Sequence, residues 1–175
     1  MDSQEHDVIT LSIHFSAYGF GYAIFENVTK PIDWRLVRLK YPKKRMALDR
    51  VRELIEFYQP SFVLIDTPKS KRRPKSRQVK QLIKEIECLA TTYNIPTLCF
   101  SPGDIERVFG AFGAHTKYER AKQIAQWLPS VSPRLPKARQ WWIREDYRLG
   151  IFEAIALAIT FYYQYYEEQP HEPIT

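Results

Sequence analysis

Three side chains that can bind a metal ion or move a proton lie next to apolar stretches of the sequence. His14 lies near the end of a β-rich run, and Asp66 directly follows four apolar residues. Glu153 is the only charged side chain within residues 149–163. Imidazole and carboxylate groups serve as general bases and as metal ligands. A buried carboxylate without a partner is costly, so Glu153 is the strongest candidate of the three.

Each of the three residues also has a simpler structural explanation. His14 fits a histidine at a strand end that is bonded to a neighbouring carbonyl. Asp66 precedes Thr67 and Pro68, and aspartate is common at turns. Glu153 could face water at the rim of its helix. The chemical interpretation therefore requires that the fold bring the three side chains together.

Hydrophobic spacing predicts an α/β fold of the ribonuclease H-like class, a five-stranded mixed sheet flanked by helices. One domain is expected over residues 8–166, with flexible ends at 1–7 and 167–175. The carboxyl ends of the central strands would bring His14 and Asp66 to one edge, where the last helix would deliver Glu153. The predicted strands are 8–15, 19–27, 33–40, 62–65 and 95–100, and the predicted helices are 47–58, 79–93, 104–108, 116–128 and 147–166.

Positive charge is concentrated in the middle of the chain. All 26 basic residues and 12 of the 20 acidic residues lie in residues 30–148, which gives that stretch a net charge of +14. Such clustering indicates a polyanionic partner such as nucleic acid, although a solvated lysine-rich surface is the simpler alternative. The residues predicted to contact phosphates are Lys69, Lys71, Arg72, Arg73, Lys75, Arg77 and Lys117.

Four segments resemble one protein family. Residues 11–26 resemble the opening hairpin of RuvC-type Holliday junction resolvases, and residues 57–66 resemble the family's strand that ends in an acid. Arg107–Gly110 with Lys117 resembles a glycine-containing segment that leads to a lysine, and residues 153–160 resemble the last helix. The segments keep the family's order and spacing.

The resemblance implies a homodimeric, Mg²⁺-dependent endonuclease that nicks four-way DNA junctions with four carboxylates. Asp66 and Glu153 match two of the four, and they would be metal ligands. His14 and Gly150 stand where the other two acids belong. His14 would then be an unusual third ligand or a base.

Losing two acids has a chemical consequence. A neutral imidazole offers one lone pair and prefers softer ions than Mg²⁺. Mg²⁺ or Mn²⁺ remain candidate ions, with weak or absent Mg²⁺ binding expected. A one-metal site, another metal, His14 as general base, and no catalysis all stay open.

The predicted function is binding of branched or structured DNA. A protein that also cleaves this DNA would be a divergent metal-dependent endonuclease. The alternatives are a catalytically degenerate DNA-binding relative and a YqgF-like protein that processes RNA. Whether the chain is an enzyme stays open at this point. The resemblance also implies a homodimer, for which the helix at 79–93 is a candidate interface.

Three further sequence features concern membrane association, the cysteines and a pair of tryptophans. The apolar run at 149–163 is too short to span a bilayer, and a cytoplasmic protein without a membrane partner is expected. Cys88 and Cys99 fit reduced thiols in the core. Trp141 and Trp142 lie in an apparent insertion, where they would stack on bases or cover the last helix.

Overall fold

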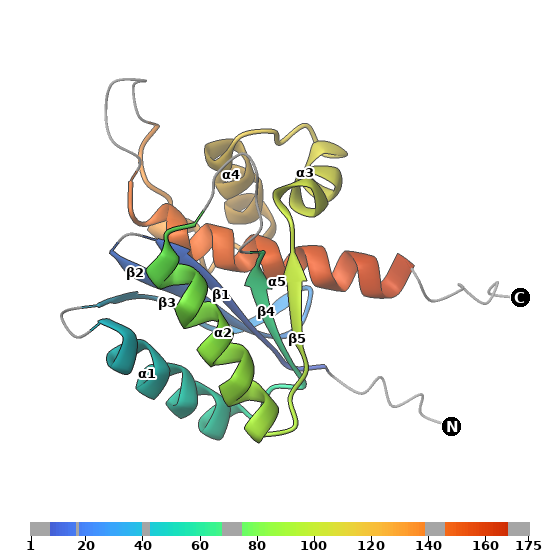
Figure 1. The fold of residues 1–175 in the computed structure, drawn as a ribbon. Helices are drawn as coiled ribbons and strands as arrows, with labels where there is room; N and C mark the ends of the chain where they lie inside the picture. Colours follow the sequence, from blue (N-terminus) through green and yellow to red (C-terminus); the bar gives the residue numbers. More distant parts are fainter. Residues whose placement is uncertain (1–7, 17, 40–42, 68–74, 139–145, 168–175) are drawn as a thin grey trace, which may run out of the picture.

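The computed structural model describes residues 8–16, 18–39, 43–67, 75–138 and 146–167. These form one mixed sheet with flanking helices (Figure 1). The strands are β1 (Thr10–Ser16), β2 (Gly19–Asn27), β3 (Lys30–Arg38), β4 (Phe62–Asp66) and β5 (Thr97–Phe100). The helices are α1 (Lys43–Tyr58), α2 (Arg77–Thr92), α3 (Pro102–Gly110), α4 (Lys117–Trp127) and α5 (Leu149–Glu167), with a short 3₁₀ helix at Ser132–Arg134.

The strand order is β3-β2-β1-β4-β5. β1, β2 and β3 form an antiparallel meander, while β4 pairs in parallel with β1 and with β5. α1 and α2 supply the crossovers that parallel pairing requires. The predicted five-stranded mixed sheet of the ribonuclease H-like class is therefore confirmed, with β3 at one edge and β5 at the other. β3 starts at Lys30, three residues before the predicted position, because it pairs with β2 up to the turn.

The two faces of the sheet are covered differently. Leu11 and Ile13 of β1 belong to the core that contains residues of α1 and α2, whereas Leu64 of β4 belongs to the core around α5. α3 and α4 pack on α5 on the side away from the sheet (Figure 1). α5 is therefore enclosed between the sheet and two helices, which explains why its sequence is apolar nearly all round.

α5 approaches the sheet most closely at a pair of glycines. A Cβ atom on Gly21 of β2 would lie 2.2 Å from the backbone oxygen of Gly150. Gly21 is the residue that pairs with His14 across the β1–β2 ladder. The start of α5 therefore lies directly over the strand position next to His14, and this contact explains the need for glycine at position 21.

We expect Gly21→Ala to lower the free energy of unfolding by about 2–3 kcal/mol, because the methyl group meets fixed backbone. Gly103→Ala in the first turn of α3 is the matched control, since the nearest atom there is Ser101 Oγ at 3.6 Å. The control should be neutral or slightly stabilising. Urea unfolding of both variants tests the packing, and equal stabilities would contradict it.

Cys88 and Cys99 carry free thiols, but both are exposed, on α2 and on the edge strand β5. The prediction that they lie in the core was wrong, because their apolar neighbours in sequence point to the opposite side of each element. The apolar stripe of α2 packs into the core through Leu82, Ile83 and Ile86, which accounts for it without a dimer interface.

None of the helices in the described part of the chain is long and apolar enough to cross a membrane.

Candidate functional site

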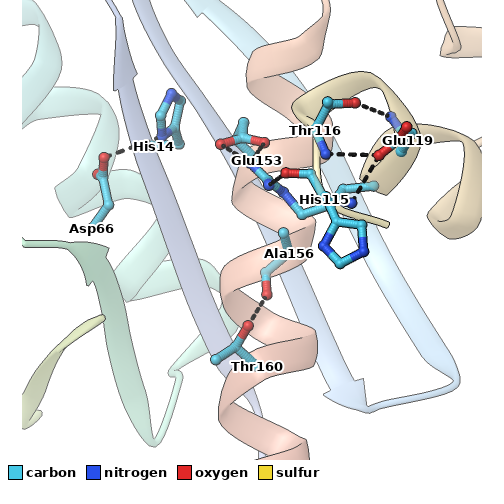
Figure 2. A network of polar contacts seen from close by, with 9 residues as sticks. His14, Asp66, His115, Thr116, Glu119, Glu153, Ala156 and Thr160 are labelled. Carbon is cyan, nitrogen blue, oxygen red and sulfur yellow. Dashed lines mark hydrogen bonds and ion pairs between the residues drawn. The ribbon is translucent and has the colours of Figure 1, made fainter. Parts of the chain in front are cut away.

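His14 and Asp66 meet at the carboxyl ends of two neighbouring strands. β1 and β4 are parallel, and Ile13 pairs with Ile65, so the next residue of each strand falls side by side. His14 Nδ1 lies 3.2 Å from Asp66 Oδ2 (Figure 2). The N–H at Nδ1 donates to the carboxylate, which leaves Nε2 as the ring nitrogen that can accept a proton or bind a metal ion.

Lys75 is a second partner of the same carboxylate. Its Nζ lies 2.5 Å from Asp66 Oδ2, and the two side chains are 13% and 16% exposed. Burial raises the pKa of Asp66, but the hydrogen bond from His14 and the charges of His14 and Lys75 outweigh burial and hold this pKa below its ordinary value. Asp66 is therefore ionised at neutral pH, with its charge balanced from within the chain.

The lowered pKa of Asp66 predicts an acid-side loss of stability. The stability that the ionised Asp66 carboxylate contributes is complete above the unfolded-state pKa near 4. It is lost as pH falls toward the lower folded-state pKa. We expect Asp66→Asn to cost about 1–3 kcal/mol at pH 7. Below about pH 4 the difference from the wild type should shrink, because the wild-type carboxylate is then becoming protonated.

Urea unfolding at several pH values measures this effect. Asp49→Asn is the control, since Asp49 is 53% exposed and should show little effect. A difference between wild type and Asp66→Asn that stays constant from pH 7 to pH 3 would contradict the prediction.

Glu153 lies on α5, on the same side of the sheet as His14 (Figure 2). Glu153 is 6% exposed, which confirms the expectation of a buried carboxylate. The alternative that it faces water at the rim of its helix is wrong. Its partner is Arg120 of α4, whose Nη2 lies 3.1 Å from Oε1 and 3.5 Å from Oε2. The resulting ion pair joins α4 to α5 in the interior.

The first turn of α4 positions Arg120. Thr116 caps the helix by accepting a hydrogen bond from the Glu119 backbone N–H at 3.2 Å, and the Glu119 carboxylate accepts from the backbone N–H groups of His115 and Thr116 (Figure 2). This capping box fixes the start of the helix. Arg120 also donates to the His115 carbonyl at 3.4 Å. The guanidinium is therefore held toward Glu153.

The donor set does not fit a pair of Mg²⁺ ions. Two-metal sites need several hard oxygen ligands and a bridging carboxylate. Here Asp66 forms ion pairs with Lys75 and His14, and Glu153 forms an ion pair with Arg120. Gly150 supplies no side-chain oxygen. Within the described residues, no group of three or more His, Cys, Asp or Glu side chains is arranged to hold a metal ion. His14, Asp66 and Glu153 do not form such a group among these residues, and their role as metal ligands stays a prediction.

The residues predicted to contact phosphates fall into three groups. Arg77 is exposed at the first position of α2, and Lys117 is half-buried at the first position of α4. Lys75 does not face solvent, because it pairs with Asp66. Lys69, Lys71, Arg72 and Arg73 lie outside the described residues, as do Trp141 and Trp142.

Arg120 is the site residue that sequence reasoning missed. It is one of many basic residues in the middle of the chain, although Ala121, Ile124 and Ala125 place it on the buried face of its helix. A charged residue within an apolar helical stripe was the signal that could have found it. Its partner was equally visible as the only charged residue within residues 149–163.

Comparison with solved structures identifies the fold. Thermus thermophilus RuvC superimposes with a TM-score of 0.68 at 16% identity, covering 91% of this chain and 97% of RuvC. The same protein in complex with its Holliday junction substrate gives 0.65 at 14% identity, with 92% and 97% covered.

The yeast mitochondrial Holliday junction resolvase Ydc2 gives a TM-score of 0.62 at 14% identity, with 89% of this chain and 78% of Ydc2 covered. No family model matches the sequence, and no curated protein matches it. The structural similarities show that the chain has the fold of the RuvC-type Holliday junction resolvases, in agreement with the resemblance in its sequence motifs.

Proposed function

We propose that the protein binds branched DNA of the four-way-junction type without cleaving it through a two-metal site. The observation that carries the binding is the match, over 92% of this chain, to a RuvC solved with its Holliday junction substrate. The positive stretch at residues 30–148 supplies the electrostatic attraction that such a partner needs. The fold and the charge therefore point to the same ligand.

The ion pairs of the site support the second half of the proposal. Both carboxylates that correspond to the family's metal ligands are bonded to basic side chains of this chain, Asp66 to Lys75 and Glu153 to Arg120. A divalent ion would have to displace these cations and would gain only two carboxylates. Binding without metal-dependent cutting is the function that fits this arrangement.

A binding and cleavage assay tests both halves. A labelled four-way junction is titrated with protein at low salt, with linear duplex DNA, single strands and duplex RNA of equal length as competitors. Mg²⁺ or Mn²⁺ is then added and the strands are separated on a denaturing gel. We expect preferential binding of the junction and intact strands under both ions.

The other outcomes have distinct meanings. Nicking that disappears in Asp66→Asn and Glu153→Gln would establish a divergent metal-dependent nuclease. Preference for duplex RNA would favour the YqgF-like alternative. Absence of binding to every nucleic acid at low salt would overturn the proposal.

The segment that follows β4 should dominate the salt dependence of binding. Replacing Lys69, Lys71, Arg72 and Arg73 by Gln should lower the slope of log affinity against log salt by about 3 to 4, if each contacts one phosphate. Replacing Lys30, Arg35, Arg45 and Arg52 on β3 and α1 removes the same charge and is the control. Equal slopes in the two variants, from fluorescence anisotropy, would show that net charge alone governs binding.

A further inference from the structure

We infer that Lys75 acts as an internal cation in the position where Asp66 would otherwise bind a divalent ion, and that its removal uncovers a one-ion site formed by Asp66 and His14. The inference concerns the same site as the proposed function. It does not depend on DNA binding, because it is a statement about the protein alone.

The position of Lys75 is fixed by the fold. It directly precedes Ser76, whose hydroxyl caps α2 by accepting from the Val79 N–H at 3.2 Å. Lys80 and Lys84, farther along α2, are exposed, whereas the Lys75 side chain is 13% exposed. The capped helix start therefore holds Lys75 beside the strand end, and the contact with Asp66 is part of the folded arrangement.

The carboxylate keeps capacity for another ligand. Both Lys75 and His14 contact Oδ2, whereas Oδ1 is buried and has no hydrogen-bond partner among the described residues. A buried carboxylate oxygen is normally satisfied, and an unsatisfied one marks a position for water or an ion. Oδ1 therefore gives the carboxylate a free acceptor position beside the one at Oδ2 that Lys75 occupies.

The chemistry of the two donors selects the ion. One carboxylate and one imidazole suit Mn²⁺ or Zn²⁺ better than Mg²⁺, which prefers an all-oxygen shell. The ammonium of Lys75 opposes any such ion, because two positive charges would share one carboxylate. Removing Lys75 should therefore raise the affinity for Mn²⁺ by about tenfold or more.

Arg120 is not an equivalent internal cation whose removal would uncover an ion site at Glu153. A guanidinium that contacts both carboxylate oxygens occupies the group more completely than an ammonium on one oxygen. Asp66 is thus the carboxylate of the site whose ion binding a single substitution can change.

The test measures Mn²⁺ binding to the protein without DNA, from the loss of the free-ion signal in electron paramagnetic resonance. Lys75→Met is compared with Lys80→Met, which removes the same charge from an exposed position of α2. Lys75→Arg keeps the charge. Asp66→Asn added to Lys75→Met removes the proposed ligand. Circular dichroism establishes that each variant is folded.

We expect tighter Mn²⁺ binding in Lys75→Met only, and loss of that gain when Asp66→Asn is added. Equal affinities in Lys75→Met and Lys80→Met would overturn the inference, as would a gain that survives Asp66→Asn. If Lys75→Met does not fold, Lys75→Arg provides the test. Tight Mn²⁺ binding by Lys75→Arg, which keeps the positive charge, would also overturn the inference. None of these results depends on whether a junction is bound.

Discussion

Arg120→Met should lower the free energy of unfolding by about 3–5 kcal/mol, because it leaves the Glu153 carboxylate buried and without its partner. The side chains of the pair are 10% and 8% exposed, so water cannot replace the guanidinium. The cost of an uncompensated buried charge exceeds that of a missing surface ion pair several-fold. Urea unfolding at neutral pH measures it.

Two controls separate the lost charge balance from lost packing. Arg107→Met removes a guanidinium that is 74% exposed and paired with Asp104, and it should cost no more than about 1 kcal/mol. Adding Glu153→Leu to Arg120→Met removes both charges and should restore most of the stability. A double variant as unstable as Arg120→Met would show that packing of the arginine, and not the pairing, carries the effect.

Much of the fold follows from the sequence because its signals are local. Alternating or continuous apolar runs bounded by turns define the strands, and helical spacing defines α1 and α2. The meeting of His14 and Asp66 was also predictable, since parallel neighbours in the sheet bring their carboxyl ends to one edge. Burial of Glu153 followed from its isolation among apolar residues.

The partners of the acids were not predictable in the same way. Lys75 reads as one of many cations in a basic segment, and only the capped start of α2 turns it toward Asp66. Arg120 and Glu153 lie on two different helices and are 33 residues apart in the chain. Side-chain pairing of this kind depends on three-dimensional placement, which no spacing rule encodes. The exposure of Cys88 and Cys99 was missed for a different reason, because apolar neighbours in sequence do not fix which side of a helix or strand a residue faces.

The two positions at which the sequence departs from the resolvase pattern lie close together. His14 pairs with Gly21 across the ladder, and Gly21 lies beneath Gly150. Gly150 is three residues before Glu153, so both positions share one face of α5. A Cβ atom at Gly150 would lie 3.1 Å from Leu36 Cδ1, the end of a flexible side chain that can move aside. A side chain at position 150 therefore meets only a movable group at its Cβ atom, and aspartate is smaller than the histidine at position 14.

We expect the double variant His14→Asp, Gly150→Asp to bind Mg²⁺ about a hundredfold more tightly than the wild type, because each added carboxylate contributes about tenfold. Mg²⁺-dependent nicking of a four-way junction should appear with it, since four carboxylates can hold and bridge two ions. Calorimetry and a denaturing gel provide the two readouts. Each single variant, and the double variant carrying Glu153→Gln, should stay inactive. A folded double variant that binds the junction but gains no Mg²⁺ affinity would show that Lys75 and Arg120, and not the missing acids, exclude the metal.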